Sequence, residues 1–258
     1  MQLAFHKMHG LGNDFMLLDC RDVDFVPSIE QICAWSDRHK GIGFDQLISI
    51  NTDEKGLYYR FFNADGGEAE QCGNGQRCIA MYLDQYTDIG LPVQINGLGG
   101  SVELNISNEG YIASFKSVKE VSQIGDWSEV SEALIYVDLG NPHLVMTKSD
   151  IAAVDLPSLA DKVHVRFPEG INIEVIESSS PESLSMRVFE RGVGETQACG
   201  SGACAALIGA GYLLEMPTEA QVAMPGGKVM VKYDVDSGVV SLSGPASYVF
   251  QGYLEITV

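Results

Sequence analysis

The sequence predicts an α+β fold built from two similar halves, each a β-sheet wrapped around a central helix. The first reason is a repeat: Phe62 precedes Cys72, and Phe189 precedes Cys199, by ten residues, with an offset of 127 between the copies. In both copies the cysteine opens a Cys-Gly-x-Gly turn. The second reason is that the residues after each turn have the apolar spacing of a helix, whereas other segments alternate apolar and polar residues as strands do.

Further matches follow in the same order along the chain, which indicates an internal duplication. They are Leu11-Gly12-Asn13 with Leu139-Gly140-Asn141, Gln46 with Asn172, and Gly99-Gly100-Ser101-Val102 with Gly226-Gly227-Lys228-Val229. Their offsets all lie between 126 and 128 residues. The chain is therefore a duplicated unit of about 120 to 130 residues, a common size for one domain.

Each half is predicted to contain several strands and one helix, which follows the Cys-Gly turn. The helices are expected at residues 75–86 and 202–215. The second is apolar nearly all round, as a helix enclosed by a sheet should be. The polar stretch at 116–131 marks the boundary, so the expected halves are residues 1–117 and 118–247, facing each other across a cleft that holds the active site.

Composition excludes several classes of function. The chain has 258 residues, 45% of them hydrophobic, and a net charge of −19 from 35 acidic and 16 basic residues. Such an excess of acid opposes nucleic-acid binding, which needs a basic face. No run approaches the roughly 20 apolar residues of a membrane span, and the N-terminus lacks the pattern of a secretory signal. We therefore expect a cytoplasmic protein.

The six cysteines point to reduced thiols. A disulfide framework is typical of small secreted chains, and the Cys-x-x-Cys spacing of zinc ribbons does not occur. Four of them, Cys20, Cys33, Cys78 and Cys204, are expected to be structural, small residues that pack like other apolar side chains.

Cys72 and Cys199 are different because each precedes a glycine-rich turn that opens a helix. The free N–H groups and the positive end of the helix dipole favour an anion there. The same field lowers the pKa of a thiol. One turn could thus hold a reactive sulfur and bind a carboxylate. Two alike thiols on either side of one carbon are what a two-base inversion of a stereocentre requires, because one removes a proton while the other delivers one.

The chain resembles the diaminopimelate epimerase family along its whole length. The matching segments are MHGLGNDF (8–15), DRHKGIGFDQ (37–46), FNADGGEAEQCGNGQRC (62–78), LGNPH (139–143), RFPEGINIE (166–174) and ERGVGETQACGSGACAA (190–206). Gly67 and Gln76 depart from it, since Ser and Ala are more usual there. The resemblance implies interconversion of LL- and meso-diaminopimelate for lysine and peptidoglycan synthesis, without pyridoxal phosphate or a metal. It also implies that a strand at 248–258 returns to the first half, and it suggests a homodimer.

The resemblance further implies a role for each matched residue. Cys72 and Cys199 are the acid–base pair, and Gly73-Asn74 and Gly200-Ser201 bind the carboxylate at the reacting carbon. His143 and Glu190 tune the thiol pKa values. The rest of the substrate is surrounded by Asn13, Gln46, Asn63, Asn141, Asn172, Glu190 and Arg191. Arg191 can grip a second carboxylate in a fork, and Glu190 can pair with a second ammonium. Taken alone, each asparagine would more often be a turn residue, and His143 could equally be a core residue.

Three other functions fit parts of the pattern. A proline racemase would share the paired cysteines, but that family typically shows CGHG where this chain has CGNG. A thiol redox or metal-binding protein would need a functional disulfide or bound zinc. A binding module without catalysis would have no use for two symmetric reactive sulfurs. The phenazine-biosynthesis isomerases are expected to share the fold but lack the cysteine pair.

Overall fold

The computed structural model describes residues 2–116, 118–125, 127–131 and 133–255. The chain divides into two compact units: unit 1 is Met1–Ala113 with Gly244–Val258, and unit 2 is Ser114–Ser243. These divisions fall a few residues before the predicted ends of the halves at 117 and 247. Residue 117 and residues 256–258 of the expected C-terminal strand lie outside the described residues.

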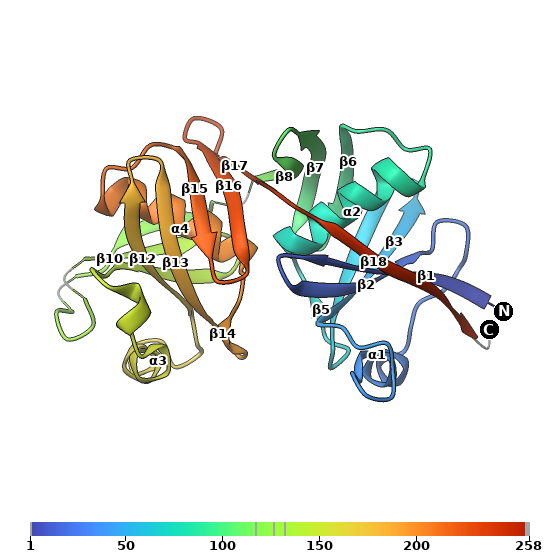
Figure 1. Cartoon of the computed structure of the whole chain (residues 1–258), viewed down its shortest axis with the longest axis horizontal. Helices are drawn as coiled ribbons and strands as arrows, with labels where there is room; N and C mark the ends of the chain where they lie inside the picture. Colours follow the sequence, from blue (N-terminus) through green and yellow to red (C-terminus); the bar gives the residue numbers. More distant parts are fainter. Residues whose placement is uncertain (1, 117, 126, 132, 256–258) are drawn as a thin grey trace. The chain divides into compact units, whose positions relative to one another are not determined.

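Among the described residues, ten strands and helices belong entirely to unit 1. They are β1 (Gln2–Gly10), β2 (Asn13–Asp19), α1 (Ile29–Ser36), β3 (Gln46–Asp53), β4 (Gly56–Asn63), β5 (Glu68–Ala69), α2 (Gly73–Tyr86), β6 (Val93–Gly97), β7 (Gly100–Ser107) and β18 (Ser247–Glu255). A further strand, β8 (Gly110–Lys116), runs across the boundary between the units. β1 pairs antiparallel with β2 and with β18, so the C-terminal strand lies beside the N-terminal one (Figure 1).

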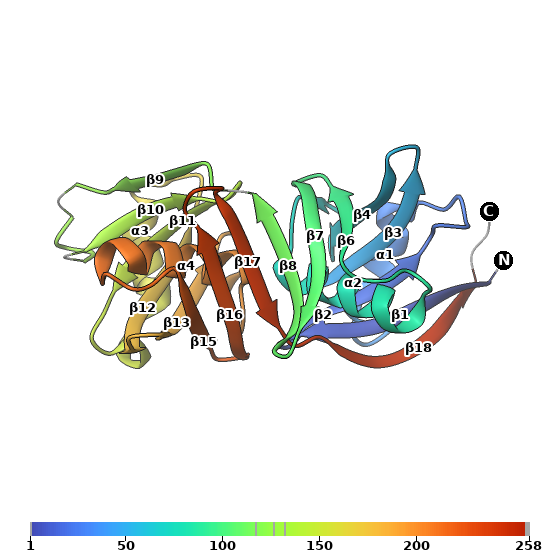
Figure 2. The same cartoon turned by 90° about the horizontal axis from the view of Figure 1, so that it is seen from above.

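The elements of unit 2 follow the same order after its first strand, apart from an added 3-10 helix. They are β9 (Glu120–Gln123), β10 (Leu134–Asp138), β11 (Pro142–Thr147), the 3-10 helix η1 (Ile151–Ala153), α3 (Leu156–His164), β12 (Asn172–Ser180), β13 (Ser183–Glu190), β14 (Gly194–Thr196), α4 (Gly200–Leu213), β15 (Glu219–Met224), β16 (Gly227–Asp234) and β17 (Val239–Gly244). β16 lies between β15 and β17, as Figure 2 shows.

The strand pairing of the two units is the same, which confirms the predicted duplication. β2 and β3 run parallel, and β3 pairs antiparallel with β4. In unit 2, β11 and β12 run parallel, and β12 pairs antiparallel with β13. The two Gly-Gly matches become tight turns, because Gly100 (φ 113°) and Gly227 (φ 140°) each open the second strand of a hairpin. The predicted α+β fold with two similar halves is therefore confirmed.

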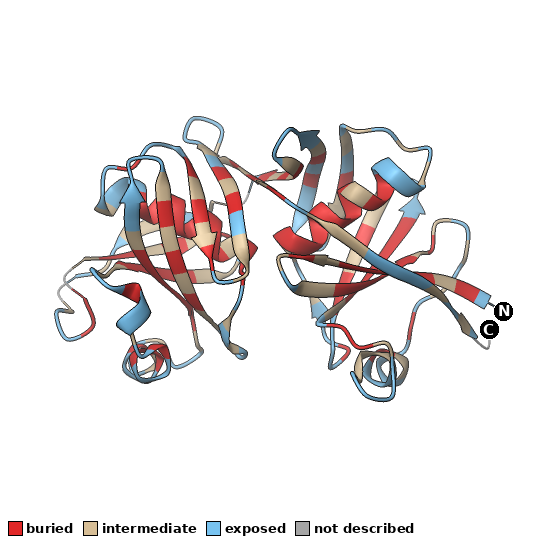
Figure 3. Ribbon diagram, in the orientation of Figure 1, coloured by how far each residue is buried: buried red, intermediate tan, exposed pale blue. Residues whose placement is uncertain are grey.

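In both units the sheet has a helix on each face. Neighbouring residues of a strand point to opposite faces. On β2, Phe15 lies near Gly75 of α2, whereas Met16 belongs to the cluster that includes Ile32 of α1. On β11, Val145 meets Gly209 of α4, whereas Leu144 packs in the cluster of α3. Strands covered on both faces are buried along most of their length, and so are α2 and α4 (Figure 3).

The two helices that follow the cysteines begin earlier than predicted. α2 begins at Gly73 and α4 at Gly200, two residues before the expected starts at 75 and 202. The prediction for α4 as an enclosed helix is confirmed, since Gly202 and every residue from there to Ala210 are buried. Among the described residues, no helix is long and apolar enough to cross a membrane.

The expectation of one helix per half is wrong, because α1 and α3 add a second. α1 has a capping box in which Ser28 and Gln31 satisfy each other's backbone N–H groups. α3 is capped by Asp155, whose side chain accepts from the Ser158 N–H. The polar stretch at 116–131 also holds a strand, β9, which pairs with β10. Burying a side chain such as Ile32 of α1 contributes roughly 1.5–3 kcal/mol, which is how so short a helix is held.

Candidate active site

Cys72 lies at the N-cap of α2, with extended backbone angles (φ −147°, ψ 106°), so the helix begins directly after it. Its side chain is half-buried, and the residues that follow, Gly73 and Asn74, are buried. The Cys72 thiol donates to Asn13 Oδ1 at 3.5 Å. The sulfur therefore stands where the helix presents its free N–H groups, as the sequence predicts.

Asn13 is fixed from two sides. Its Nδ2 donates to Asp45 Oδ2 at 3.1 Å, and its Oδ1 accepts from Asn74 Nδ2 at 3.3 Å. Asn74 in turn accepts at its Oδ1 from Arg77 Nη2 at 2.8 Å. Three of the predicted residues of unit 1, Asn13, Cys72 and Asn74, are thus in one hydrogen-bonded group.

Gln46 and Asn63 form a second pair in unit 1. They stand opposite each other where β3 begins and β4 ends. Gln46 Nε2 donates to Asn63 Oδ1 at 2.9 Å. Gln46 is half-buried and Asn63 is exposed, and the pair offers neutral hydrogen-bonding groups, as a site that must bind without adding charge would need.

Cys199 occupies the equivalent place at the N-cap of α4 (φ −126°, ψ 117°) but is buried. Gly202 N–H donates to Cys199 Sγ at 3.3 Å, and Ser201 Oγ lies 3.6 Å from the sulfur. Burial raises the pKa of the Cys199 thiol well above its usual value, and the carboxylates of Glu190 and Glu174 act in the same direction. The hydrogen bonds from Ser201 and Gly202 oppose this shift.

Asn141 and His143 join this group from β11 and the turn before it. Asn141 Nδ2 donates to Ser201 Oγ at 3.3 Å, and Asn141 Oδ1 lies 3.1 Å from His143 Nε2. The His143 ring is fully buried, and its Nδ1 lies 2.7 Å from Glu174 Oε1. His143 is therefore connected to Cys199 through Asn141 and Ser201.

Asn172, Glu190 and Arg191 complete the predicted set in unit 2. Asn172 is buried; its Nδ2 donates to the carbonyl of Pro142 at 3.0 Å, and its Oδ1 accepts from the backbone N–H of Arg191 at 3.0 Å. Glu190 Oε1 accepts a hydrogen bond from Thr196 Oγ1. Asn172 thus anchors the backbone that carries Arg191, whose side chain is exposed.

Sequence reasoning missed three charged residues that hold this machinery in place: Asp45, Arg77 and Glu174. Each lies inside a segment that the resemblance already contains, within two residues of a named residue. Arg77 and Glu174 are fully buried. A charged residue within an apolar helix or strand is a usable signal, because such groups are rarely buried unless they are paired.

The other four cysteines lie mostly where expected. Cys78 and Cys204 are fully buried in α2 and α4, and Cys20 is buried too. Burial raises the pKa of the Cys78 thiol well above its usual value, which makes it unreactive. The expectation for Cys33 is wrong in one respect, since this residue of α1 is exposed rather than packed. None of the six cysteines forms a disulfide bond.

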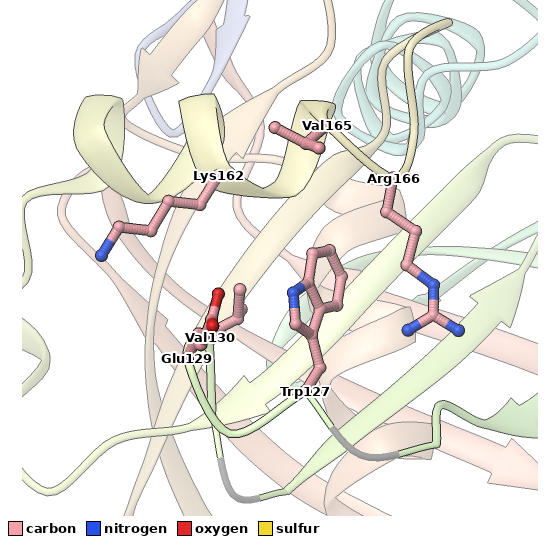
Figure 4. A pocket seen from close by; sticks show the side chains of 6 residues that line it. All are labelled: Trp127, Glu129, Val130, Lys162, Val165 and Arg166. Atoms are coloured by element: carbon pink, nitrogen blue, oxygen red, sulfur yellow. The ribbon is translucent and has the colours of Figure 1, made fainter.

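A small surface pocket lies elsewhere in unit 2. It has a volume of about 210 Å³ and is lined by Trp127, Glu129, Val130, Lys162, Val165 and Arg166 (Figure 4). The Arg166 guanidinium lies 5.2 Å from the centre of the Trp127 ring, a cation–π contact. None of the predicted site residues lines this pocket.

Comparison with known proteins gives a consistent result. The family model described as diaminopimelate epimerase matches residues 5–118 and 135–249, one segment in each half. A diaminopimelate epimerase of Neisseria meningitidis is 37% identical, with 98% of each chain covered. One from Pseudomonas syringae pv. tomato is 36% identical over 99% of this chain and 100% of that protein.

Solved structures with little sequence identity share the fold. A phenazine biosynthesis protein of the PhzF family from Bacillus anthracis has a TM-score of 0.72 at 16% identity, over 99% of this chain and 100% of that one. A probable proline racemase from Agrobacterium radiobacter has a TM-score of 0.69 at 12% identity, over 99% of this chain and 93% of that one. At these identities the likeness concerns the fold alone.

Proposed function

The chain belongs to the diaminopimelate epimerase family, and we propose that Cys72 and Cys199 are the two acid–base groups with which it interconverts LL- and meso-diaminopimelate. One sulfur, as thiolate, removes the α-proton, and the other, as thiol, delivers a proton to the opposite face of the carbon. The roles exchange for the reverse reaction. The observation that carries this proposal is that each cysteine is the N-cap of the equivalent helix in its unit.

The turns beside the sulfurs are suited to the carboxylate of the reacting centre. The N–H groups of Gly73 and Asn74, and of Gly200 and Ser201, belong to the first turns of α2 and α4, where no intrahelical acceptor is available. Helix N-termini favour negative charge. As the α-proton leaves, charge develops toward the carboxylate, and fixed donors stabilise it as an oxyanion hole does.

The surroundings of Cys199 support its role as proton donor. Burial and the carboxylates of Glu190 and Glu174 raise the pKa of this thiol, which favours its protonated form. Gly202 N–H and Ser201 Oγ stand next to the sulfur and can stabilise it once the proton has left.

Glu190 and Arg191 favour a substrate with a second amino-acid end. A guanidinium can bind a carboxylate through two parallel hydrogen bonds, and Glu190 can pair with an ammonium. Proline has neither group at its far end. Asn172 accepts a hydrogen bond from the Arg191 backbone N–H, which fixes the position from which the Arg191 side chain extends. We therefore assign these two residues to the end of diaminopimelate that does not react.

Incubation with LL-diaminopimelate in deuterated water tests the proposal. Solvent deuterium should enter at one α-carbon while the optical rotation changes. Cys72→Ala and Cys199→Ala should each abolish epimerisation from both directions, because each turnover needs both sulfurs. Full turnover by either variant would show the two-base assignment to be wrong.

Cys33→Ala is the matched control, since Cys33 is the one exposed cysteine outside the proposed site and is expected to be dispensable. Arg191→Gln should raise the KM for diaminopimelate much more than it lowers kcat, as expected for a group that binds the end that does not react. An unchanged KM would remove Arg191 from the assignment.

Two broader expectations belong to this proposal. The reaction would take place in the cytoplasm and supply meso-diaminopimelate for lysine and peptidoglycan synthesis. The protein would work as a homodimer, which sedimentation of the purified chain would test directly.

A further inference from the structure

Glu174 on β12 is a buried carboxyl group to which the proposed reaction gives no task. It is fully buried, and its Oε1 lies 2.7 Å from His143 Nδ1. Its Oε2 has no hydrogen-bond partner among the described residues. A Cβ added to Gly202 would lie 2.9 Å from Glu174 Oε1, so this carboxyl packs directly against the first turn of α4. A buried charge is expensive unless it is paired, and groups placed so are often functional.

The hydrogen bonds beyond His143 have a definite direction. Asn141 Nδ2 donates to Ser201 Oγ, so Asn141 Oδ1, which can only accept, is the atom 3.1 Å from His143 Nε2. His143 Nε2 must then carry a proton. Ser201 Oγ already accepts from Asn141, which leaves its own hydrogen free to point at Cys199 Sγ, 3.6 Å away. Each hydrogen bond in this series is thus donated in the direction of Cys199 Sγ.

A proton must also lie between Glu174 and His143. A neutral imidazole carries one proton. If it were on Nδ1, donated to the carboxylate, Nε2 would be an acceptor facing another acceptor. With Nε2 protonated, the 2.7 Å contact between Nδ1 and Glu174 Oε1 requires a second proton, held by the ring or by the carboxyl. Burial raises the pKa of Glu174, which favours keeping that proton in the pair.

Unit 1 has no counterpart of this pair. Phe15 stands opposite Gln46 in the register of β2 and β3, as His143 stands opposite Asn172 in that of β11 and β12. Two residues further along β3 is Ile48, where β12 has Glu174. Both Phe15 and Ile48 are fully buried apolar residues. Isoleucine is therefore the residue that unit 1 already has at the position equivalent to Glu174.

We propose that Glu174 is a positioning residue for Cys199: it keeps a proton on His143 Nε2 and thereby aligns Asn141 and Ser201 as hydrogen-bond donors toward the sulfur. The inference rests on the proposed acid–base role of Cys199 and adds a residue that acts on it through three others. Its consequence is that a sulfur buried beside carboxylates can still carry negative charge during part of each turnover.

The charges around Cys199 show why such help is needed. Glu190 from β13 and Glu174 from β12 both oppose a thiolate, as does burial itself. His143 from β11 is the basic group connected to the sulfur from this side. Gly202 N–H is a fixed donor, whereas the Ser201 hydroxyl can rotate, so its orientation depends on the chain behind it.

The protonation of His143 can be read directly by ¹⁵N NMR. Imidazole nitrogens with and without a proton have well-separated shifts, and the signal of His143 is assigned by its loss in His143→Gln. We expect Nε2 to carry a proton at neutral pH in the wild-type protein. A ring protonated on Nδ1 alone would overturn the proposal, whatever the behaviour of any variant.

The rate at which iodoacetamide alkylates Cys199, followed by mass spectrometry of its peptide across a range of pH, measures thiolate formation without substrate. Glu174→Ile installs the side chain of unit 1 and should slow alkylation about tenfold at neutral pH, a shift of about one pH unit. Glu174→Gln can donate from its amide to Nδ1, keeps Nε2 protonated, and should stay within about threefold of wild type. Glu177→Gln, on the same strand, is the control and should match wild type.

Two results would overturn the positioning role: an unchanged alkylation profile in Glu174→Ile, or an equal loss in Glu174→Gln, which would mean that charge rather than the hydrogen bond matters. The proposed function fails separately, if Cys199→Ala still epimerises diaminopimelate. Neither the NMR nor the alkylation measurement uses turnover, so the two failures are distinguishable.

Discussion

Asn13 and Asn141 stand at equivalent positions in the two units, but their side-chain amides point in opposite senses. Asn13 presents its oxygen to Cys72 and gives its nitrogen to Asp45. Asn141 presents its nitrogen to Ser201, beside Cys199, and turns its oxygen to His143. The partner behind each amide decides its orientation, because a carboxylate only accepts and a protonated ring nitrogen only donates. The two equivalent asparagines therefore present opposite hydrogen-bonding groups toward their cysteines: an acceptor beside Cys72 and a donor beside Cys199.

Asp45→Asn should lower kcat about tenfold with little loss of stability. An amide at position 45 can donate as well as accept, so Asn13 loses one of its two anchors, and only Asn74 then holds its oxygen toward Cys72. If the misoriented amide loses one hydrogen bond worth about 1.4 kcal/mol in the transition state, the activation free energy rises by that amount and the rate falls about tenfold. Steady-state kinetics in both directions measure it. Asp53→Asn, an exposed change at the far end of β3, should leave kcat unchanged; equal effects of the two substitutions would contradict the explanation.

Asp14 should stabilise the fold in a pH-dependent way. Burial disfavours its charged form, but hydrogen bonds and charge from Arg38 and Lys7 outweigh burial and hold the pKa of Asp14 well below its usual range. A carboxyl whose pKa is depressed by folding adds stability above its unfolded pKa of about 3.9, and this stability is lost as the pH falls through the folded value. Asp14→Asn should lower the free energy of unfolding by about 2 kcal/mol at pH 7, less than a fully buried pair would.

Urea unfolding at pH 7, 5 and 3 checks this prediction. The gap between Asp14→Asn and wild type should be nearly full at pH 5 and smaller at pH 3. Asp88→Asn, at an exposed position in the same unit, should show no gap at any of them. A gap that widened as the pH fell would have the wrong sign for a carboxylate with a lowered pKa.

Gly202→Ala tests the close contact between α4 and the buried network. The new methyl carbon would lie 2.9 Å from Glu174 Oε1, closer than side chains tolerate, and 3.3 Å from Cys199 Sγ, which is a tight contact. We expect a loss of about 1–3 kcal/mol in stability, as for other overpacked sites, and at least a tenfold loss of kcat. Gly211→Ala in the same helix meets nothing nearer than 3.8 Å and should stabilise the protein by about 0.5–1 kcal/mol through helix propensity. Thermal unfolding and kinetics of the two variants separate a local clash from a general effect of alanine.

Sequence patterns predicted those parts of the fold that local chemistry determines. The Cys-Gly turns predict α2 and α4 because the start of a helix needs an N-cap residue, and the glycines allow the backbone to turn there. α1 and α3 were missed although Ser28 and Asp155 are good caps, since helices of eight and nine residues carry little periodic pattern. Their stability comes from burial against the sheet, which is a tertiary effect.

The site divides in the same manner. The repeat and the resemblance identified Asn13 and Asn141 as equivalent residues, but not that their amides are reversed. That difference comes from Asp45 and His143, which the strand pairing brings to them. The role of Glu174 could not be predicted from the sequence, because it depends on His143, which the parallel pairing of β11 and β12 brings next to it.

Gln76, one of the two departures from the family pattern, should be energetically coupled to Tyr59. Gln76 is fully buried, its Nε2 donates to Tyr59 Oη at 2.9 Å, and its Oε1 has no partner among the described residues. Tyr59→Phe leaves the amide with neither atom satisfied and should cost about 1–3 kcal/mol. Gln76→Ala removes both polar atoms but leaves a cavity. In the double variant no unpaired amide remains, so its loss of stability should be at least 0.5 kcal/mol smaller than the sum of the two single losses. Urea unfolding of the four proteins at one pH gives the coupling, and strict additivity would show that the hydrogen bond contributes nothing.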